Sequence, residues 1–307
     1  MKSNRASNTA KVIAASTILL ASERHQSDLV APGAAELCEI FLSGSISDRI
    51  LAASARHPLT RCFWRWVERL TLPGIIFHYW HRKRWIEDRC RVAIADGFER
   101  VVVIGAGFDT LGIRLSREFD RLDVIELDHP ATQELKRSSL ARNEMALSEN
   151  FRFSTIDLTH EALPSGDAKP TVFILEGVLM YLPEMDVCRL FRGLLQSQSD
   201  RIRVIFSFMT RWPDGGSGFR PHSGLIERWL ALNKEPFTWA IEPEAVADFL
   251  AGNDFRLSEM ALTREFSNTP LGTLEGENLV VCEPKLPPQP DLIPRPRDRM
   301  AMAALMW

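Results

Sequence analysis

Val101-Val-Val-Ile-Gly-Ala-Gly-Phe-Asp-Thr110 is the stretch of sequence that decides the fold. It opens with four consecutive β-branched residues and no polar alternation, a pattern that predicts a strand buried on both faces of a parallel sheet. Gly105 and Gly107 then allow a sharp turn and a close approach of a ligand to the backbone. A short helix is expected over residues 110–119, with its first amides facing the same crevice. The stretch is therefore typical of a nucleotide-binding α/β unit.

A second apolar run, Leu122-Asp-Val-Ile-Glu-Leu-Asp128, is expected to form the neighbouring strand. Asp128 stands 21 positions after Gly107, where an acidic side chain can accept hydrogen bonds from ribose hydroxyls. A dinucleotide fingerprint needs a third glycine, but Thr110 stands at that position. The sequence thus disfavours pyrophosphate and favours a single adenosine without phosphates. The alternative for the Gly-x-Gly loop alone is a tight turn without a ligand.

From Glu99 onward, strand-like and helix-like segments alternate along the chain. Strands are expected near residues 100–104, 122–127, 152–156, 171–175 and 201–208, and helices near 130–146 and 184–197. The last two strands, near 256–262 and 278–282, are expected to form a hairpin pair at the edge of the sheet. This alternation predicts an α/β fold with a doubly wound, mostly parallel sheet of seven strands.

Three regions are expected along the chain. Residues 1–95 are expected to form an N-terminal helical cap, and residues 96–284 the α/β core. The core carries an insertion at about 209–250, and the proline-rich residues 285–307 are expected to form a poorly ordered tail. Several aromatic side chains of the cap are expected to pack in its interior rather than to hold a cofactor. These side chains are Phe63, Trp64, Trp66, Trp80 and Trp85.

Composition and charge exclude several classes of protein. With 307 residues, 45% hydrophobic and 25% charged, the chain can bury one large core and is typical of a soluble globular protein. A net charge of −3 offers no electrostatic reason to expect nucleic acid as a partner. The five cysteines are widely spaced and include no Cys-x-x-Cys pair, so neither disulfides nor a metal site is expected. The cysteine pattern predicts a cytoplasmic location.

The N-terminal residues loosely imitate a secretory signal peptide. A basic start is followed by an apolar run at residues 12–21, but Ser16 and Thr17 interrupt this run. We expect the first helix of the cap here rather than secretion. No run in the sequence approaches the roughly 18 apolar residues that cross a bilayer, so no membrane partner is expected.

Further polar side chains follow predicted strands, at the edge where an open α/β sheet binds its ligand. Asp157 is placed to contact the amino group of an adenine, and Glu176 the polar edge of a ligand's amino-acid part. Either carboxylate could instead cap a helix or be solvated. Before the first strand, Arg82 or Arg84 could clamp a ligand carboxylate, although such a charge run is usually a solvated helix face.

Four ordered motifs carry a resemblance to a known family. They are Gly105-Ala-Gly-Phe-Asp-Thr110, Glu126-Leu-Asp-His-Pro130, Ile156-Asp-Leu158 and Glu176-Gly-Val-Leu-Met-Tyr-Leu182. Over roughly residues 15–283 the chain resembles the leucine carboxyl methyltransferase family. Its members are class I S-adenosylmethionine-dependent methyltransferases and include bacterial O-methyltransferases of secondary metabolism. The resemblance implies a Rossmann-like fold, S-adenosyl-L-methionine as the cofactor, and a small-molecule carboxylate or phenol as the substrate.

The resemblance also implies roles for individual residues. Arg82 matches the arginine that holds the carboxylate of S-adenosylmethionine, while Gly105 and Gly107 match the loop under its methionine part. Asp128 matches the ribose ligand, and Asp157 matches the adenine contact. The full set expected at the cofactor, with Glu176 as an acidic neighbour, is Arg82, Gly105, Ala106, Gly107, Asp109, Glu126, Asp128, Asp157, Leu158 and Glu176.

Two positions depart from the family pattern. Many bacterial members have an arginine after Asp-Thr where this chain has Leu111. The acidic residue after the basic cluster is Glu87 rather than an aspartate. Neither change removes a cofactor contact, but both bear on the local packing.

Sequence features favour a carboxylate as the acceptor of the methyl group. A carboxylate is ionised at neutral pH and needs no general base, whereas a phenol, with a pKa near about 10, would benefit from one. No histidine stands in a context that marks it as such a base. Tyr181 is the candidate for orienting the acceptor oxygen, and the alternative is a packed tyrosine with its hydroxyl satisfied. Candidate substrate contacts, three of them in the insertion, are Tyr79, Trp212, Arg220 and His222.

Other functions are compatible with the same sequence. A nucleotide-dependent oxidoreductase would use the same sheet, but the absent third glycine argues against it. The resemblance also admits methylation of a protein C-terminus, and a non-catalytic protein-binding scaffold is a further alternative. Methylation of tRNA is disfavoured because the chain shows neither a basic stripe nor a nucleic-acid-binding module.

Overall fold

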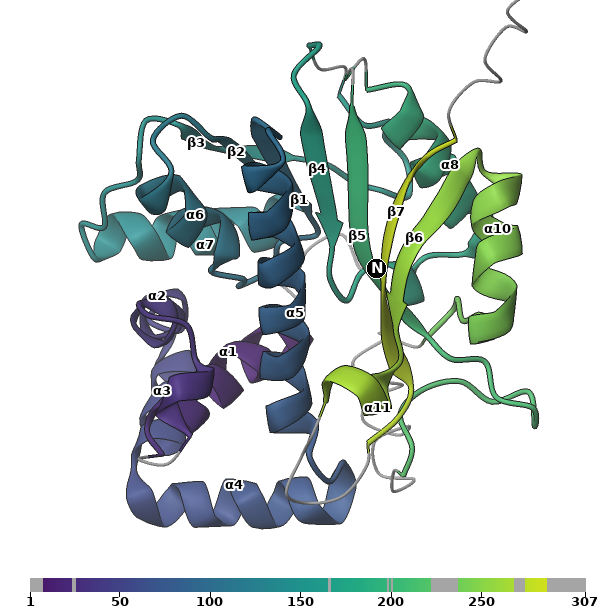
Figure 1. The fold of residues 1–307 in the computed structure, drawn as a ribbon. Helices are drawn as coiled ribbons and strands as arrows, with labels where there is room; N and C mark the ends of the chain where they lie inside the picture. The colour runs from purple at the N-terminus through teal and green to yellow at the C-terminus, as the bar shows by residue number, and fades with distance from the viewer. Residues whose placement is uncertain are drawn as a thin grey trace, which may run out of the picture.

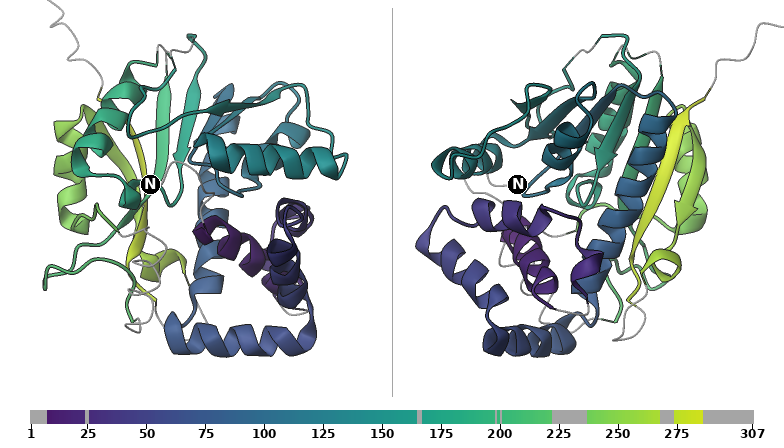
Figure 2. Two further views of the ribbon diagram at one scale, coloured as in Figure 1. Left: turned by 180° about the vertical axis from the view of Figure 1, so that it is seen from behind. Right: turned by 60° about the vertical axis from the view of Figure 1, so that its left-hand side comes forward.

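A group of N-terminal helices lies at one end of a β-sheet, and one long helix, α5 (Ile75–Ala95), runs from this group along the sheet (Figure 1). The structure is a computed structural model that describes residues 8–23, 26–164, 167–197, 199, 201–221, 237–267 and 274–285. Further helices flank the strands, and two more views show how they are arranged around the sheet (Figure 2).

The other described helices are α1 (Asn8–Ala21), α2 (Ala34–Phe41), α3 (Ile46–Arg56), α4 (Pro58–Thr71), α6 (Leu111–Glu118), α7 (Pro130–Arg142), α8 (Glu184–Leu195), α10 (Val246–Gly252) and α11 (Thr263–Phe266). The described strands are β1 (Arg100–Ile104), β2 (Asp123–Asp128), β3 (Phe151–Thr155), β4 (Thr171–Leu175), β5 (Ile202–Met209), β6 (Phe255–Ala261) and β7 (Glu277–Pro284). Short 3-10 helices lie at Ser27–Leu29, Leu179–Tyr181 and Pro243–Ala245.

The described strands form one seven-stranded sheet in the order β3-β2-β1-β4-β5-β7-β6. The pairs β1–β2, β1–β4, β2–β3 and β4–β5 are parallel. Strand β7 is antiparallel to both β5 and β6. The predicted doubly wound, mostly parallel seven-stranded sheet is confirmed. The last two strands pair at one edge as expected, with β7 inserted between β5 and β6.

One predicted helix ends earlier than its pattern suggested. The helix expected near 130–146 ends at Arg142. Asn143 donates a side-chain hydrogen bond back to the carbonyl of Ser139, over 2.8 Å. Glu144 then adopts a φ of 52°, a left-handed conformation that terminates helices.

Alternate residues of β1 belong to two hydrophobic cores, one on each face of the sheet. Val101 and Val103 pack with buried side chains of α5 and α6. Val102 and Ile104 pack with buried side chains of α8 and α10. A strand that faces apolar neighbours on both sides needs no polar alternation, which explains the apolar run of β1.

Helix α5 joins the cap to the core. It contacts α1 of the cap and also β4, β5 and β7 of the sheet. Its residues Trp80, Ile86 and Cys90 are all buried. Helix α5 thus joins the cap to the sheet, and α2 makes a second contact with the core through α7.

The expectation that the aromatic residues of the cap pack in its interior is wrong for two of them. Trp80 and Trp85 are buried, but Phe63 and Trp66 are 54% and 59% exposed. Both belong to α4, which lies at the far end of the cap from the sheet (Figure 1). When both faces of a helix carry apolar residues, their spacing in the sequence does not show which face is buried.

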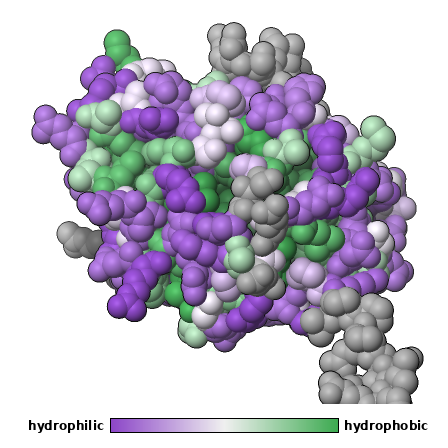
Figure 3. Space-filling view, turned by 90° about the horizontal axis from the view of Figure 1, so that it is seen from above, coloured by the Kyte–Doolittle hydropathy of each residue, from purple (hydrophilic) through white to green (hydrophobic). Residues whose placement is uncertain are grey.

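The end of the molecule opposite α4 presents mostly hydrophilic residues, with hydrophobic ones visible between them (Figure 3). Within the described residues, none of the helices combines the length and the apolar character that crossing a membrane requires.

A buried ion pair joins α7 to β2. The Nζ of Lys136 lies 2.6 Å from Oε2 of Glu126, and both side chains are 1% exposed. The same Nζ donates to the carbonyl oxygen of Asp109 over 2.6 Å. A Cβ on Gly112 of α6 would lie 2.8 Å from Oε1 of Glu126, so the glycine leaves room for this carboxylate.

We expect Lys136→Met to lower the free energy of unfolding by about 3–5 kcal/mol, because it leaves the buried Glu126 carboxylate unpaired. Burial already raises the pKa of Glu126 to about 7, and loss of the ammonium would raise it further. The native state would then bind a proton that the unfolded state lacks, so the loss of stability should shrink as the pH falls.

Urea unfolding at about pH 8 and about pH 6 measures both the loss and its pH dependence. The matched variant Arg137→Met changes an exposed cation on the same helix and should cost less than about 0.5 kcal/mol. Equal losses for the two variants would contradict the assignment.

Candidate functional site

A cavity of about 630 Å³ lies between the cap and the end of the sheet where β1, β2 and β4 finish. The loop 105–107, Asp128 and Glu176 line its sheet side. Side chains of α1, α3, α4 and α5 line its cap side. The carboxyl ends of parallel strands are the place where open α/β sheets bind ligands.

The loop after β1 is held by hydrogen bonds to β2. Gly105 N donates to the carbonyl oxygen of Leu127 over 2.7 Å, and Gly107 N donates to Oδ2 of Asp128. Asp128 Oδ1 accepts a second backbone hydrogen bond, from His129 N, over 2.6 Å. Gly105 and Gly107 have φ angles of 68° and 49°, which side chains disfavour. The end of β2 thus fixes the loop that lines the cavity.

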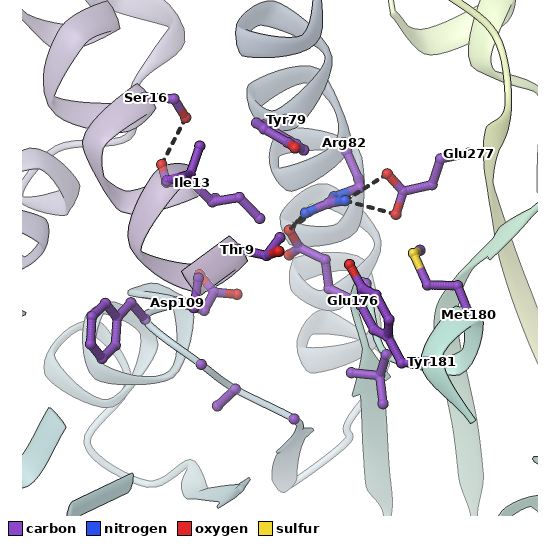
Figure 4. A pocket seen from close by; sticks show the side chains of 18 of the residues that line it. Thr9, Ile13, Ser16, Tyr79, Arg82, Asp109, Glu176, Met180, Tyr181 and Glu277 are labelled. Carbon is purple, nitrogen blue, oxygen red and sulfur yellow. Dashed lines mark hydrogen bonds and ion pairs between the residues drawn. The ribbon is translucent and has the colours of Figure 1, made fainter. Parts of the chain in front are cut away.

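Arg82 of α5 lies at the centre of a buried ionic network (Figure 4). Its Nη1 donates to the two carboxylate oxygens of Glu277, over 2.7 and 2.6 Å. Its Nε and Nη2 donate to Oε1 of Glu176, over 3.0 and 2.6 Å. His78 Nε2 lies 3.0 Å from Oε2 of Glu277. The network ties α5 to the end of β4 and to the start of β7.

Burial and neighbouring charges set the protonation states of this network. Burial favours the neutral form of Glu277, but Arg82 and His78 outweigh it and lower its pKa to about 2. Burial lowers the pKa of His78, so its ring is neutral and its Nε2 carries the hydrogen that Glu277 accepts. Burial opposes the charged guanidinium of Arg82, yet Glu277 and Glu176 raise its pKa above the ordinary value. Arg82 and Glu277 are therefore charged.

Lys83 extends the network toward the glycine loop. Its Nζ lies 2.9 Å from Oε1 of Glu176 and 3.2 Å from Oδ1 of Asp109. Asp109 Oδ1 also accepts from the backbone N of Thr110, over 2.6 Å. Burial tends to raise the pKa of Asp109, but Lys83 and other nearby cations hold it well below its usual range. The joined cations and carboxylates, with a net charge of −1, are Arg82, Lys83, Asp109, Glu176 and Glu277.

Asp157, Leu158 and His129 line the cavity on the other side of the glycine loop. Asp157 Oδ1 accepts hydrogen bonds from the hydroxyl and the backbone N of Thr159, over 2.6 and 3.0 Å. The hydroxyl bond is the main cause that lowers the pKa of Asp157. Asp157 therefore makes the local hydrogen bonds of a capping residue and also lines the cavity.

All but one of the residues expected at the cofactor line this cavity. The exception is Glu126, whose side chain is buried against Lys136. Glu126 lies at the fourth position of β2, two residues before Asp128, so both side chains point to the same face of the strand. Only Asp128, at the strand end, reaches the cavity, and the assignment of Glu126 to the cofactor is corrected.

The candidate substrate contacts divide into two groups. Tyr79 and Tyr181 line the cavity, whereas Trp212 and Arg220 do not. The Arg220 guanidinium lies 4.6 Å from the ring centre of Trp212 and pairs with Asp214. These two side chains therefore satisfy each other away from the cavity, and this part of the prediction is corrected.

Other predicted positions fall away from the cavity or outside the described residues. His222 lies outside the described residues. The alternative clamp Arg84 donates to the carbonyl oxygen of Asp28, over 3.0 Å and in an exposed place, so it does not face the cavity. From the predicted insertion, the cavity is instead lined by Phe219 and Phe237.

Sequence reasoning missed two charged residues of the site, Lys83 and Glu277. Lys83 directly follows Arg82 in the basic cluster, and nothing in the cluster distinguishes which cations face inward. Glu277 opens the apolar run of β7 and is fully buried. A single carboxylate at the start of a buried strand was the available signal, since such a charge needs a partner.

Leu111 and Glu87 are the two positions that depart from the family pattern, and the structure shows the contacts around them. Glu87 of α5 accepts from Nη2 and Nη1 of Arg114, over 2.6 and 2.9 Å. It also accepts from Nη2 of Arg91 over 2.8 Å. Arg114 lies one turn after Leu111 on α6, so an arginine does reach the acidic residue of α5.

We expect Gly105→Ala to destabilise the protein more than Gly97→Ala. Both glycines have positive φ, and an alanine there costs about 1–2 kcal/mol. A Cβ on Gly105 would also collide with Cγ2 of Val178, whereas one on Gly97 would meet no atom within 4 Å.

Urea unfolding of both variants measures the difference, and Val178→Ala in the Gly105→Ala background should recover most of it. The double variant should then be about as stable as Gly97→Ala, because the cost of an alanine at positive φ remains in both proteins. Equal stability of the two single variants would contradict the close approach.

Comparisons with known proteins show the family of this chain. The sequence profile described as leucine carboxyl methyltransferase matches residues 36–195, which is just over half of the chain. A putative S-adenosyl-L-methionine-dependent methyltransferase of Mycobacterium ulcerans is 31% identical over 187 residues, covering 57% of this chain and 61% of that protein. One of Streptomyces coelicolor is 36% identical over 189 residues, covering 58% and 62%. The chain thus matches about three fifths of the length of these relatives.

A solved structure agrees with the fold. A putative methyltransferase from Thermobifida fusca superimposes with a TM-score of 0.54 at 17% identity, covering 81% of this chain and 94% of the other. The cofactor named for the sequence relatives is S-adenosyl-L-methionine. With its matched profile, its Rossmann-like sheet and its cavity at the strand ends, the chain belongs to the leucine carboxyl methyltransferase family.

Proposed function

We propose that the protein transfers a methyl group from S-adenosyl-L-methionine to a carboxylate oxygen of a small molecule, forming a methyl ester. The observation that carries the proposal is one cavity in which the glycine loop and Asp128 meet a buried ionic network of net charge −1. A volume of about 630 Å³ suits small molecules, whose pockets usually enclose about 300–1,000 Å³.

The residues at the sheet side fit the parts of this cofactor. Each oxygen of Asp128 accepts one backbone hydrogen bond and keeps a lone pair for a ribose hydroxyl. Gly105 and Gly107 line the cavity where the methionine part would lie. The four hydrogen bonds of Arg82 leave one N–H of Nη2, which together with Lys83 would hold the carboxylate. Glu176 would accept from the ammonium.

The charge of the network also fits. S-adenosylmethionine carries an ammonium, a sulfonium and a carboxylate, so its net charge is positive, and the network contributes one excess negative charge. Charges that leave water need such compensation. A dinucleotide would instead bring the negative pyrophosphate to a site that is already negative, which supports the methyltransferase over the oxidoreductase.

When bound, the cofactor would supply an electrophilic methyl group. A C–O bond to the acceptor would form as the C–S bond breaks, and the electron pair of the C–S bond would stay on the sulfur of S-adenosylhomocysteine. The chain has to hold the acceptor oxygen about 3–3.5 Å from that carbon. It also has to limit the access of water. Ala10 of α1 lies over the loop, with its Cβ 3.4 Å from the position of a Cβ on Gly107.

The side chains at the cavity favour an acceptor that is already ionised. Burial raises the pKa of Tyr79 to about 12, so its hydroxyl stays protonated and cannot act as a general base. His129 uses Nδ1 to accept from Ala131 N at the start of α7, over 3.3 Å. The carboxylates of the network are engaged by Arg82 and Lys83. A carboxylate acceptor needs no general base in such surroundings.

Tyr181 is the side chain that we assign to orienting the acceptor. Its hydroxyl points toward the Arg82–Glu176 pair from the opposite side of the cavity to α1 (Figure 4). It belongs to the 3-10 helix that follows β4, directly after the loop that carries Glu176. A hydroxyl there can donate to one oxygen of an acceptor carboxylate while the other oxygen reacts.

Isothermal calorimetry with S-adenosylhomocysteine tests the cofactor site. We expect saturable binding to the wild-type chain and a loss of affinity of at least about tenfold in Asp128→Asn, since hydrogen bonds to charged groups contribute about 1.5–3 kcal/mol. The control Asp120→Asn changes an exposed carboxylate of similar position in the chain and should bind normally. The proposal fails if the wild-type chain does not bind, or if Asp128→Asn binds as tightly as the control.

Release of S-adenosylhomocysteine with a panel of carboxylic acids tests the role of Tyr181. We expect Tyr181→Phe to lower kcat/KM up to about tenfold, which corresponds to one lost hydrogen bond, and to leave the affinity for S-adenosylhomocysteine unchanged. Tyr79→Phe is the parallel variant, because it removes the other tyrosine hydroxyl of the cavity. If only Tyr79→Phe lowered kcat/KM, the assignment of Tyr181 would be wrong.

A further inference from the structure

We infer that the acceptor is an amphipathic carboxylic acid whose hydrocarbon chain lies in the part of the cavity formed by the cap. This inference rests on the proposed methyl transfer and adds the class of the acceptor. We call this part the cap lobe. It is lined by Ile13 and Leu19 of α1, Leu51 and Ala55 of α3, Val67 of α4 and Ile75 of α5.

The polar side chains of the cap lobe are already satisfied by the protein. The hydroxyls of Ser16 and Thr71 each donate to a carbonyl of their own helix, over 2.7 Å. The indole N–H of Trp64 donates to Oγ of Ser54, over 3.0 Å. A polar ligand in this lobe would lose its hydrogen bonds to water and would find no free polar side chain among its described residues to replace them, which is costly. A hydrocarbon chain has no such hydrogen bonds to lose, and burying its apolar surface favours binding.

Glu68 places a carboxylate at the same wall, but its oxygens also have partners. Oε2 accepts from Nη1 of Arg65 over 2.8 Å, and Oε1 accepts from the backbone N of Ile76 over 3.0 Å. Its side chain is 2% exposed. The bond from Ile76 ties α4 to the start of α5, and the bond from Arg65 lies within α4.

The cap lobe leads away from the ionic network along α5. Ile75, Tyr79 and Arg82 follow one another at about one-turn intervals and all line the cavity. With a rise of about 1.5 Å per residue, Ile75 lies about 10 Å from Arg82 along the helix. Tyr79 stands between the apolar and the charged part. The carboxylate of the acceptor therefore belongs at the tyrosines, and its chain points toward α3 and α4.

Fluorescence titration with cis-parinaric acid, an 18-carbon fatty acid, tests the lobe without requiring turnover. We expect saturable binding in the presence of S-adenosylhomocysteine. Saturated acids of increasing length should displace the probe with an affinity that rises roughly fourfold per methylene, the equivalent of about 0.8 kcal/mol, until the lobe is full. The wild-type series alone carries this test, so it does not depend on the folding of any variant.

Leu51→Trp should fill the lobe, weaken binding of the longest acids at least about tenfold and move the optimum toward shorter chains. Ile50→Trp is the matched control, because Ile50 is the neighbouring residue of α3 and is 63% exposed. It should bind all acids as the wild-type chain does. Val67→Phe fills the lobe from α4 and replaces Leu51→Trp if that variant does not fold.

The outcomes separate this inference from the proposed function. Absence of saturable probe binding, displacement that does not depend on chain length, or stronger displacement by a leucine-terminated peptide overturns the inference. Methylation of short polar acids without any dependence on chain length would overturn it while the methyltransferase proposal stands. Binding of the fatty acids without methylation of any of them would overturn the inference, because an acid that receives no methyl group is not the acceptor.

Discussion

The contact of one buried arginine with two glutamates is the constraint on which the rest of the structure depends. Arg82 bridges Glu176 at the end of β4 and Glu277 at the start of β7. Burying three charged groups costs several kcal/mol per ion. This cost is offset only because the guanidinium and the two carboxylates attract one another at short distance and hydrogen-bond to one another. Since Arg82 lies in the middle of α5, the helix that carries the cap cannot slide or rotate against the sheet without breaking them. With the second contact between α2 and α7, this holds together the two layers between which the cavity lies.

The same contact governs what the sheet side of the cavity can hold. Because the guanidinium is shared between two carboxylates, it does not act as a free cation, and Lys83 supplies the second positive charge beside Glu176. The excess negative charge then suits a cationic cofactor rather than a phosphate. The sequence suggested that this arginine simply clamps a ligand carboxylate, but in the folded protein it is one member of a buried group with a net charge of −1.

Local patterns predicted the sheet and much of the site, because their causes are local. An apolar run predicts a buried strand, and a carboxylate directly after the run predicts the end of that strand. Asp128, Asp157 and Glu176 could therefore be placed at the cavity. Glu277 could not, since it meets Arg82 across 195 positions of sequence. Glu126 was misplaced because a side chain two residues before a strand end faces the same side but stays inside the packing. The exposed Phe63 and Trp66 show the same limit for helices.

The cavity joins two surfaces that arise from different rules. Its sheet side is fixed by strand ends and by charges that must balance, so each residue there has few alternatives. Its cap side is built from apolar residues of α1, α3 and α4, and the hydroxyls of Ser16 and Thr71 among them donate to carbonyls of their own helices. Under the proposed function, a substitution among these apolar residues would change which hydrocarbon chain fits. The charge requirement at the strand ends and the apolar requirement at the cap are thus met by separate groups of residues that line one cavity.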